Sequence, residues 1–238
     1  MISSRTQAFA MHEVDRFANR HRAGKRLGEA VAKLRLPQPV TVLGLPRGGV
    51  PVAFEVAQVV NAPLDVLCVS KLSMPGQPEM AIGAVAVGDV VAHESGATPF
   101  LPFLRPSFPQ LAANEKCELR RRESLYRGGL PPLDIAGHHV VLVDDGIDTA
   151  SSMLAAIRAA KKLRAASVTV ASPVAAAEAL RCVAEEADRV VILETPPILF
   201  AIAEWYEHFG PVDDIAVGEL LARAARRHPF RPPVASHT

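Results

Sequence analysis

Short apolar segments alternate with longer helix-like segments in the C-terminal half of the chain, and this alternation constrains the fold more than any other feature. The apolar segments lie at 140–143, 168–171 and 190–193, and each is rich in β-branched residues. The segments between them, 151–163 and 175–186, are long enough for helices. Short buried strands separated by helices are typical of parallel β-α-β units. The sequence therefore predicts an α/β fold with a doubly wound parallel sheet.

The N-terminal half fits the same scheme up to residue 70 and then becomes irregular. Residues 72–127 are too long for a plain connection, so we interpret them as an inserted lid or binding loop. We expect one domain over 1–228 and a disordered tail over 229–238. The other expected elements are an amphipathic helical region at 12–35, strands at 40–45 and 64–70, a helix at 50–60, a loop at 72–80, a hairpin of strands at 81–87 and 90–92, a polar helix at 111–127, an aromatic loop or helix at 196–209, and a last helix at 214–227.

The composition narrows the classes of function. The chain has 238 residues, with 26 Lys and Arg against 25 Asp and Glu, which gives a net charge of +1. This balance argues against general electrostatic binding to nucleic acid or to an anionic membrane. No apolar stretch approaches the ~20 residues of a membrane span, and the three cysteines form no Cys-x-x-Cys pair. We therefore expect a cytoplasmic protein without nucleic-acid or membrane partners.

Asp144 and Asp145 form the strongest candidate site, because they directly follow the apolar segment 140–143. Two charged side chains after a buried strand must emerge at the carboxyl edge of the sheet, where parallel sheets bind their ligands. Asp148 follows three residues later and adds a third carboxylate. Carboxylates at such an edge suit sugar hydroxyls and a hydrated Mg²⁺.

The residues that follow open a predicted helix with hydroxyl side chains. They are Asp148, Thr149, Ala150, Ser151 and Ser152. A helix N-terminus presents free backbone N–H groups, so this loop suits a phosphate monoester. Beside the acid pair it indicates a ribose phosphate, with the diol on the carboxylates and the 5′-phosphate in the loop. The alternative is that the acids and hydroxyls only cap the helix.

A second candidate loop contains Arg47, Gly48 and Gly49 and follows the strand expected at 40–45. Glycines allow the backbone to approach a ligand closely, and a guanidinium suits phosphate oxygens. The loop has neither the Gly-x-Gly-x-x-Gly fingerprint nor a P-loop lysine, and an ordinary turn is the alternative. Lys71 ends the next expected strand, so it would point at the same edge of the sheet, where it could neutralise a polyphosphate. The alternative is a surface lysine whose charged end simply reaches the solvent.

Aromatic residues follow the last expected strand at Trp205, Tyr206 and Phe209. At this spacing they are more typical of a core or an interface than of a lid over a base. Loops at this edge often line a site, so the lid is the alternative interpretation.

With these residues in hand, segment 140–152 resembles the phosphoribosyl-pyrophosphate motif of the type I phosphoribosyltransferases. Most of the chain, about 12–227, is similar to a bacterial family of predicted phosphoribosyltransferases whose acceptor is unknown. The segments that carry this similarity are LPRGGVPVA at 45–53, KL at 71–72, PG at 75–76, PE at 78–79, AIGAV at 81–85, YRGG at 126–129, LETP at 193–196 and WYE at 205–207.

The resemblance implies a role for each candidate residue. Asp144 and Asp145 would take the ribose hydroxyls, directly or through Mg²⁺, while the loop at 148–152 would bind the 5′-phosphate. Segment 46–49 would form the pyrophosphate loop, in which type I enzymes often use an unusual, sometimes cis, peptide. Lys71 would belong to a flexible loop that closes over the site.

The base would be held by a hood built partly from the insert at 72–127 and partly from segment 194–209. Asp148 is the residue type with which purine phosphoribosyltransferases handle a proton of the base, which favours a purine-like acceptor. Ala150 departs from the family pattern, which has glycine there; a methyl group would crowd the phosphate or disfavour a positive φ. Ser152 replaces the usual threonine and keeps the hydroxyl.

The resemblance implies Mg²⁺-dependent transfer of a phosphoribosyl group from phosphoribosyl pyrophosphate to a nitrogenous base, with release of pyrophosphate. Arg47, Lys71, backbone amides and Mg²⁺ would stabilise the departing pyrophosphate. Type I relatives commonly associate, so a homodimer is expected. Two alternatives stay open. The first is a non-catalytic module that senses phosphoribosyl pyrophosphate or a nucleotide, which the alanine at position 150 suggests. The second is a hydrolase that needs no acceptor base.

Overall fold

A five-stranded parallel sheet forms the centre of the protein, with strand order β2-β1-β6-β7-β8. The computed structural model describes residues 16–74, 77–87, 90–93, 108–128 and 133–228. The strands of this sheet are β1 (Val40–Gly44), β2 (Leu64–Val66), β6 (His139–Val143), β7 (Ser167–Val174) and β8 (Arg189–Glu194). The doubly wound parallel sheet predicted from the sequence is confirmed. The tail at 229–238 and the hairpin turn at 88–89 lie outside the described residues.

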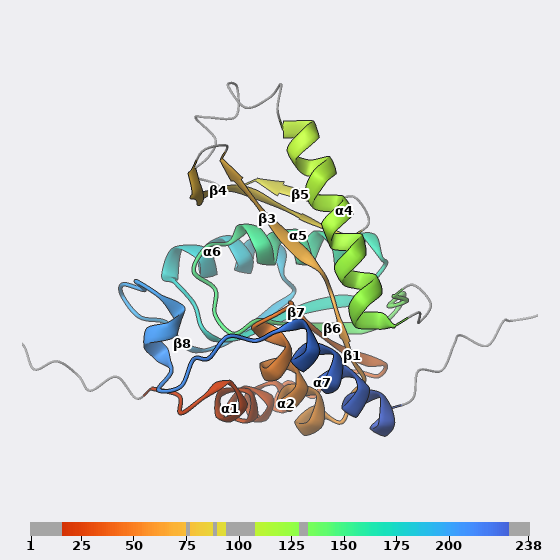
Figure 1. Cartoon of the computed structure of the whole chain (residues 1–238). Helices are drawn as coiled ribbons and strands as arrows, with labels where there is room; N and C mark the ends of the chain where they lie inside the picture. The colour runs from red at the N-terminus through yellow and green to blue at the C-terminus, as the bar shows by residue number, and fades with distance from the viewer. Residues whose placement is uncertain (1–15, 75–76, 88–89, 94–107, 129–132, 229–238) are drawn as a thin grey trace, which may run out of the picture.

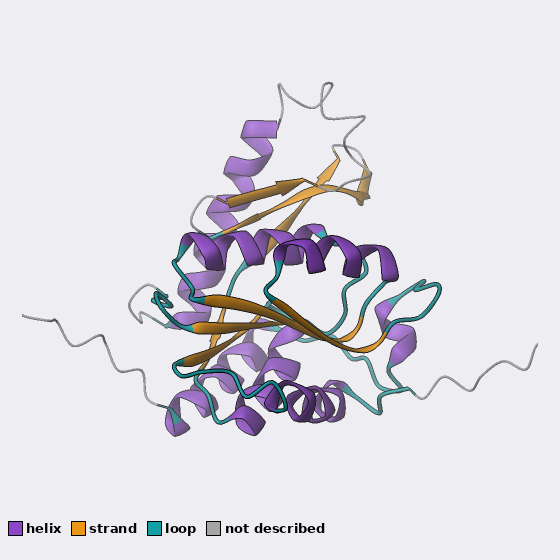
Figure 2. Cartoon of the chain, turned by 180° about the vertical axis from the view of Figure 1, so that it is seen from behind, coloured by secondary structure: helices purple, strands orange, loops and turns teal. Residues whose placement is uncertain are grey.

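Helices cover both faces of this sheet (Figures 1 and 2). They are α1 (Arg20–Ala32), α2 (Gly49–Val60) and α7 (Asp214–Arg227) on one side, and α5 (Ser151–Lys162) and α6 (Ala177–Glu186) on the other. Successive side chains of a strand point to opposite faces. Accordingly, Val140 and Leu142 pack in the cluster that contains α5, whereas Val141 and Val143 pack in the cluster that contains α1 and α2.

A second, antiparallel sheet stands beyond α5, at the top of Figure 1. Its strands are β3 (Val69–Met74), β4 (Gln77–Ala86) and β5 (Val90–His93), and the long helix α4 (Phe108–Arg127) lies beside it. Ala84, Ala86 and Ala92 of this sheet belong to the same buried cluster as the apolar residues of α5. The insert is therefore a small sheet and a helix that stand over one side of the central sheet.

Two predictions about residues 64–80 are wrong. The single strand expected at 64–70 is divided, because β2 ends at Val66 and β3 begins at Val69 in the other sheet. The loop expected at 72–80 is mostly strand, with 75–76 outside the described residues. Prolines and glycines suggested a loop, but antiparallel pairing of β3 with β4 satisfies the backbone there.

The strand order reverses between β1 and β6. The chain passes from β1 through α2 to β2 on one side, and from β6 through α5 to β7 and β8 on the other. In sheets of this kind the crevice outside the carboxyl ends at the reversal is the usual ligand site. The segments that follow these two strands are 45–49 and 144–150, and they contain most of the predicted site residues.

The aromatic segment after β8 contains one turn of 3-10 helix, η2 (Ile202–Trp205), and is otherwise irregular. An isolated parallel bridge joins Phe17 to Tyr206, so this segment lies against the start of α1. In the part of the chain that the structure describes, no helix combines the length and apolarity needed to cross a bilayer.

Candidate active site at the carboxyl edge of the sheet

The two adjacent acids emerge from β6 in different environments. Asp145 is buried, with 7% of its surface exposed, and Asp144 is partly buried. The Asp145 backbone N–H donates to Oδ1 of Asp144 over 2.9 Å. Burial and the neighbouring charge of Asp145 raise the pKa of the Asp144 carboxyl well above its usual range. The carboxyl edge thus carries one acid whose ionisation is opposed by its surroundings.

Gly48 and Gly49 bring the loop after β1 into direct contact with these acids. A Cβ atom on Gly48 would overlap Oδ2 of Asp145. A Cβ atom on Gly49 would lie 2.7 Å from the Val143 carbonyl oxygen, closer than real Cβ contacts. The close contact between the loop after β1 and the loop after β6 therefore requires glycine at both positions, whether or not a ligand is bound.

Arg20 is a site residue that the sequence did not reveal. Its Nε donates to Oδ2 of Asp145 over 2.7 Å, and its Nη1 donates to the Gly210 carbonyl over 2.7 Å. The guanidinium also lies over the Phe209 ring, with Cζ 3.7 Å from the ring centroid. Because Asp145 is 125 residues away in the chain, Arg20 looked like any other charge on an amphipathic helix.

Tyr206 fixes the same acid from the other side. Its hydroxyl donates to the backbone carbonyl of Asp145 over 2.6 Å. Its ring packs between Phe17 and Phe209, with centroids 5.6 and 5.0 Å away. Of the two interpretations of the aromatic segment, the core interpretation holds for Tyr206, and Trp205 packs at the edge of that cluster.

The loop at 148–152 forms an uncapped helix N-terminus. Helix α5 begins at Ser151, and its N-cap residue is Ala150, with no side-chain capping hydrogen bond. Oδ1 of Asp148 accepts the N–H of the adjacent Thr149 over 2.7 Å, before the helix begins. The Thr149 hydroxyl is buried and has no partner among the described residues. At the N-cap residue itself, the side-chain capping that the alternative interpretation expects is therefore absent.

Ala150 does not carry the cost that the sequence suggested. Its φ of −78° and ψ of −23° are ordinary right-handed helical values. The prediction that alanine is strained here by a positive φ is therefore wrong. Its side chain is 3% exposed and packs in the cluster beneath α5. The methyl group is thus part of the core under the loop.

Lys71 reaches this loop from the second sheet. It lies in β3 opposite Ala84, and therefore does not end a strand of the central sheet as expected. Its Nζ is 3.6 Å from Oδ1 of Asp148, and both side chains are 47% exposed. The predicted lysine is at the site, but the antiparallel sheet places it there.

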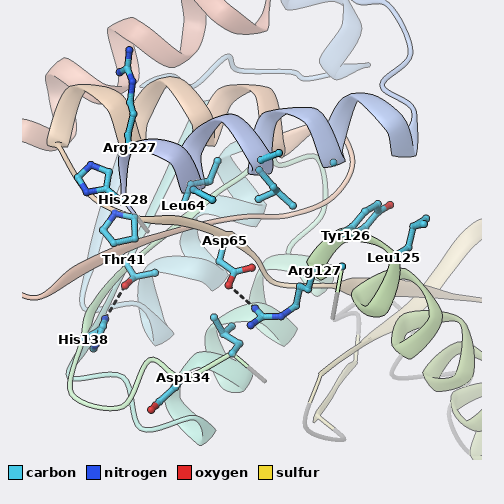
Figure 3. A pocket seen from close by; sticks show the side chains of 17 residues that line it. Thr41, Leu64, Asp65, Leu125, Tyr126, Arg127, Asp134, His138, Arg227 and His228 are labelled. Atoms are coloured by element: carbon cyan, nitrogen blue, oxygen red, sulfur yellow. Dashed lines mark hydrogen bonds and ion pairs between the residues drawn. The ribbon is translucent and has the colours of Figure 1, made fainter. Parts of the chain in front are cut away.

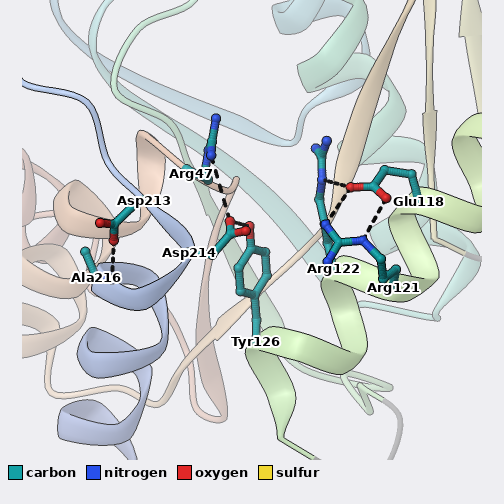
Figure 4. A network of polar contacts seen from close by, with 8 residues as sticks. All are labelled: Arg47, Glu118, Arg121, Arg122, Tyr126, Asp213, Asp214 and Ala216. Atoms are coloured by element: carbon teal, nitrogen blue, oxygen red, sulfur yellow. Dashed lines mark hydrogen bonds and ion pairs between the residues drawn. The ribbon is translucent and has the colours of Figure 1, made fainter.

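Arg47 lies in the loop after β1, beside the start of α7 (Figure 4). The peptide bond between Pro46 and Arg47 is cis, a form that the family resemblance leads one to expect. Nη1 of Arg47 lies 4.0 Å from Oδ1 of Asp214, at the start of α7. The Tyr126 hydroxyl donates to the same oxygen over 2.6 Å. Arg47 itself is 57% exposed, so its guanidinium is accessible to an anion.

The arrangement brings together an acid pair, an open helix N-terminus and two exposed cations at one crevice. The family profile of the phosphoribosyl transferase domain matches residues 13–205. The chain belongs to this family. The resemblance inferred from segment 140–152 is thereby confirmed.

Relatives of this phosphoribosyl transferase domain are known from sequence and structure. Proteins from two strains of Mycobacterium tuberculosis are 38% identical over 210 residues and carry provisional names as phosphoribosyl transferases. The match covers 88% of this chain and 47% of theirs, so the chain spans about half the length of these curated relatives. The crystal structure of TT1426 from Thermus thermophilus has a TM-score of 0.74 at 41% identity, covering 87% of this chain and 98% of that chain.

The phosphoribosyl transferase domain also has a cavity of about 810 Å³ away from the predicted site (Figure 3). It includes Thr41 and Leu64 near the amino ends of β1 and β2, and the ion pair of Asp65 with Arg127 lies in its wall. None of the predicted site residues lines it. We do not assign the transfer chemistry to this cavity, because parallel sheets bind reactive ligands at their carboxyl ends.

Proposed function

We propose that the chain transfers a phosphoribosyl group from phosphoribosyl pyrophosphate to a nitrogenous base and releases pyrophosphate. The observation that carries the proposal is the open N-terminus of α5, with the unpartnered Thr149 hydroxyl, directly beside Asp144 and Asp145. Backbone N–H groups at a helix start bind a phosphate monoester, and carboxylates suit a vicinal diol. A ribose 5-phosphate carries both groups, a phosphate for the helix N-terminus and a diol for the carboxylates.

The remaining charges suit the leaving group. Arg47 lies in the loop after β1 and Lys71 lies in β3, and both side chains are about half exposed. As pyrophosphate leaves C1 of the sugar, these cations would stabilise the charge that develops on it, while the sugar becomes oxocarbenium-like. Asp148, which is held near Lys71, would accept the proton of a purine-like base as its nitrogen attacks C1.

Mg²⁺ fits the acid pair as an ion that arrives with the substrate. Within the described ranges, no group of three or more His, Cys, Asp or Glu could hold a metal by itself. Mg²⁺ commonly keeps several waters and uses one or two carboxylates together with substrate phosphates. Burial, and after it the charge of Asp145, raises the pKa of Asp144, and a nearby cation would favour its ionised form. When bound, the ion would neutralise charge on the pyrophosphate.

Calorimetric titration with phosphoribosyl pyrophosphate, with and without Mg²⁺, tests the proposal. We expect Mg²⁺-dependent binding that weakens about tenfold in Thr149→Val, because the variant loses one hydrogen bond to a charged phosphate. Thr169→Val is the matched control, since Thr169 also has a buried, unpartnered hydroxyl but lies inside β7. No binding at millimolar ligand, or equal weakening in both variants, would contradict the proposal.

The acceptor is then sought by screening bases for release of pyrophosphate. Release with a purine-like base supports the transfer reaction. Binding without release for any base would identify a sensing module. Loss of phosphoribosyl pyrophosphate without an acceptor would identify a hydrolase.

A further inference from the structure

We infer that Arg20 is a positioning residue that divides the acid pair, fixing Asp145 toward a ribose hydroxyl and leaving Asp144 as the acid that faces the cation. The inference rests on the proposed function and assigns separate roles to the two neighbouring acids. The evidence for it is the different set of contacts that each acid makes.

Arg20 is held on three sides, so it can fix the group that it touches. Its Nε reaches Asp145, its Nη1 reaches the Gly210 carbonyl, and its plane stacks on Phe209. The side chains of Arg20 and Asp145 are only 12% and 11% exposed. A guanidinium that is stacked and bonded at two nitrogens has little freedom to turn. The carboxylate orientation of Asp145 is therefore set before a ligand arrives.

The backbone around Asp145 is fixed as well. Tyr206 donates to its carbonyl, and Gly48 lies directly against its carboxylate. These contacts come from the loop after β1 and from the segment after β8, so Asp145 joins both walls of the crevice. A side chain enclosed in this way keeps its orientation and can accept a hydrogen bond from a hydroxyl.

Charge separates the two acids further. The ion pair of Arg20 with Asp145 is neutral overall, and the guanidinium repels a second cation at the same carboxylate. Asp144 makes no ion pair with any described residue, and its Oδ1 contact is a backbone N–H. Asp144 is therefore the acid of the pair without a cationic partner among the described residues, so a cation that reaches the pair gains most there.

The test compares three ligands in Arg20→Gln, in Arg20→Lys and in Arg22→Gln as the matched control. Arg22 lies on the same helix and is exposed. The ligands are phosphoribosyl pyrophosphate, ribose 5-phosphate and magnesium pyrophosphate, all followed by calorimetry. The first two carry the diol and the third does not. Circular dichroism and the emission of Trp205, the single tryptophan, verify that each variant is folded.

We expect Arg20→Gln to bind both sugar ligands about 10- to 100-fold more weakly, the range found when a group that orients a ligand is removed. Binding of magnesium pyrophosphate should change less than about twofold. Arg20→Lys should recover part of the loss, because an ammonium can pair with Asp145 but cannot also stack and reach Gly210. Arg22→Gln should match the wild type.

Mn²⁺ binding, followed by electron paramagnetic resonance in the presence of pyrophosphate, separates the acids themselves. Asp144→Asn should lower the Mn²⁺ affinity about tenfold, while Asp145→Asn should leave it nearly unchanged and weaken the sugar ligands as Arg20→Gln does. If Arg20→Gln does not fold, Arg20→Lys and Asp145→Asn still give the comparison.

Three results would overturn the inference. Equal weakening of all three ligands would mean that Arg20 only supports the structure. Sugar binding in Arg20→Gln at the wild-type level would mean that it does not position Asp145. A wild type that binds no phosphoribosyl pyrophosphate would remove the proposed function together with the inference, whereas the first two results leave the proposed function standing.

Discussion

Lys71 Nζ lies 3.6 Å from Asp148 Oδ1, and this contact joins the antiparallel sheet to the loop that opens α5. The two residues belong to different layers of the molecule, and nothing local in the sequence places them together. Their proximity puts a cation and a carboxylate side by side at the mouth of the crevice.

We predict that Lys71→Met weakens phosphoribosyl pyrophosphate binding about tenfold or more, because the ligand loses a charge-assisted contact. The melting temperature should barely change, since exposed ion pairs contribute only about 0–1 kcal/mol. Calorimetry and thermal melting measure the two effects. Lys161→Met, at the far end of α5, is the control and should leave binding intact. A large loss of stability in Lys71→Met would show that the contact mainly supports the fold.

Gly48→Ala should lower the free energy of unfolding by about 1–3 kcal/mol, the usual cost of overpacking. The new methyl group would overlap the Asp145 carboxylate. Gly218→Ala is the matched control, because its Cβ would meet open space on α7. That variant should be more stable by about 0.5–1 kcal/mol, since alanine favours a helix over glycine. Urea unfolding measures both, and equal effects would contradict the packing argument.

Asp144→Asn should raise stability at neutral pH while it weakens cation-dependent binding. The folded-state pKa of Asp144 lies above its unfolded value, because of burial and the charge of Asp145. The folded state thus holds the proton more tightly, and stability falls as pH rises through the folded pKa. Asparagine carries no charge, so the variant avoids this loss of stability, and its Oδ1 can still accept the Asp145 backbone N–H. Melting from pH 4 to 8 should show a gain on the order of 1 kcal/mol at the neutral end, or roughly 2–4 °C.

The three cysteines should differ sharply in reactivity. Burial, with a smaller effect from the Glu123 charge, raises the pKa of the Cys68 thiol to about 12. At pH 8 the thiolate fraction is then on the order of one in 10⁴, and the side chain is also inaccessible. Cys117 is exposed and should react first with a disulfide reagent, while Cys68 reacts only after unfolding. Rapid labelling of Cys117→Ser/Cys182→Ser, in which Cys68 is the one remaining cysteine, would contradict the packing of Cys68 beneath α4.

The central sheet and much of its functional edge could be predicted from the sequence, because they depend on local patterns. Apolar strands that alternate with helices admit few arrangements other than parallel β-α-β units. Asp144 and Asp145 then had to appear where β6 ends, since charged groups cannot stay in the sheet. The helix start at Ser151 follows from the same logic, and the chain belongs to the family that the motif suggested.

Other features depended on contacts between distant segments and were decided only by the tertiary structure. β3 leaves the central sheet because β4 offers it an antiparallel partner, which moves Lys71 to another layer. Arg20 meets Asp145 only because α1 packs beside the aromatic segment after β8. The sequence determined which chemical groups reach the edge, since that follows from strand ends and helix starts. Packing decided which of those groups contact one another, because contacts between distant residues leave no periodic pattern in the sequence.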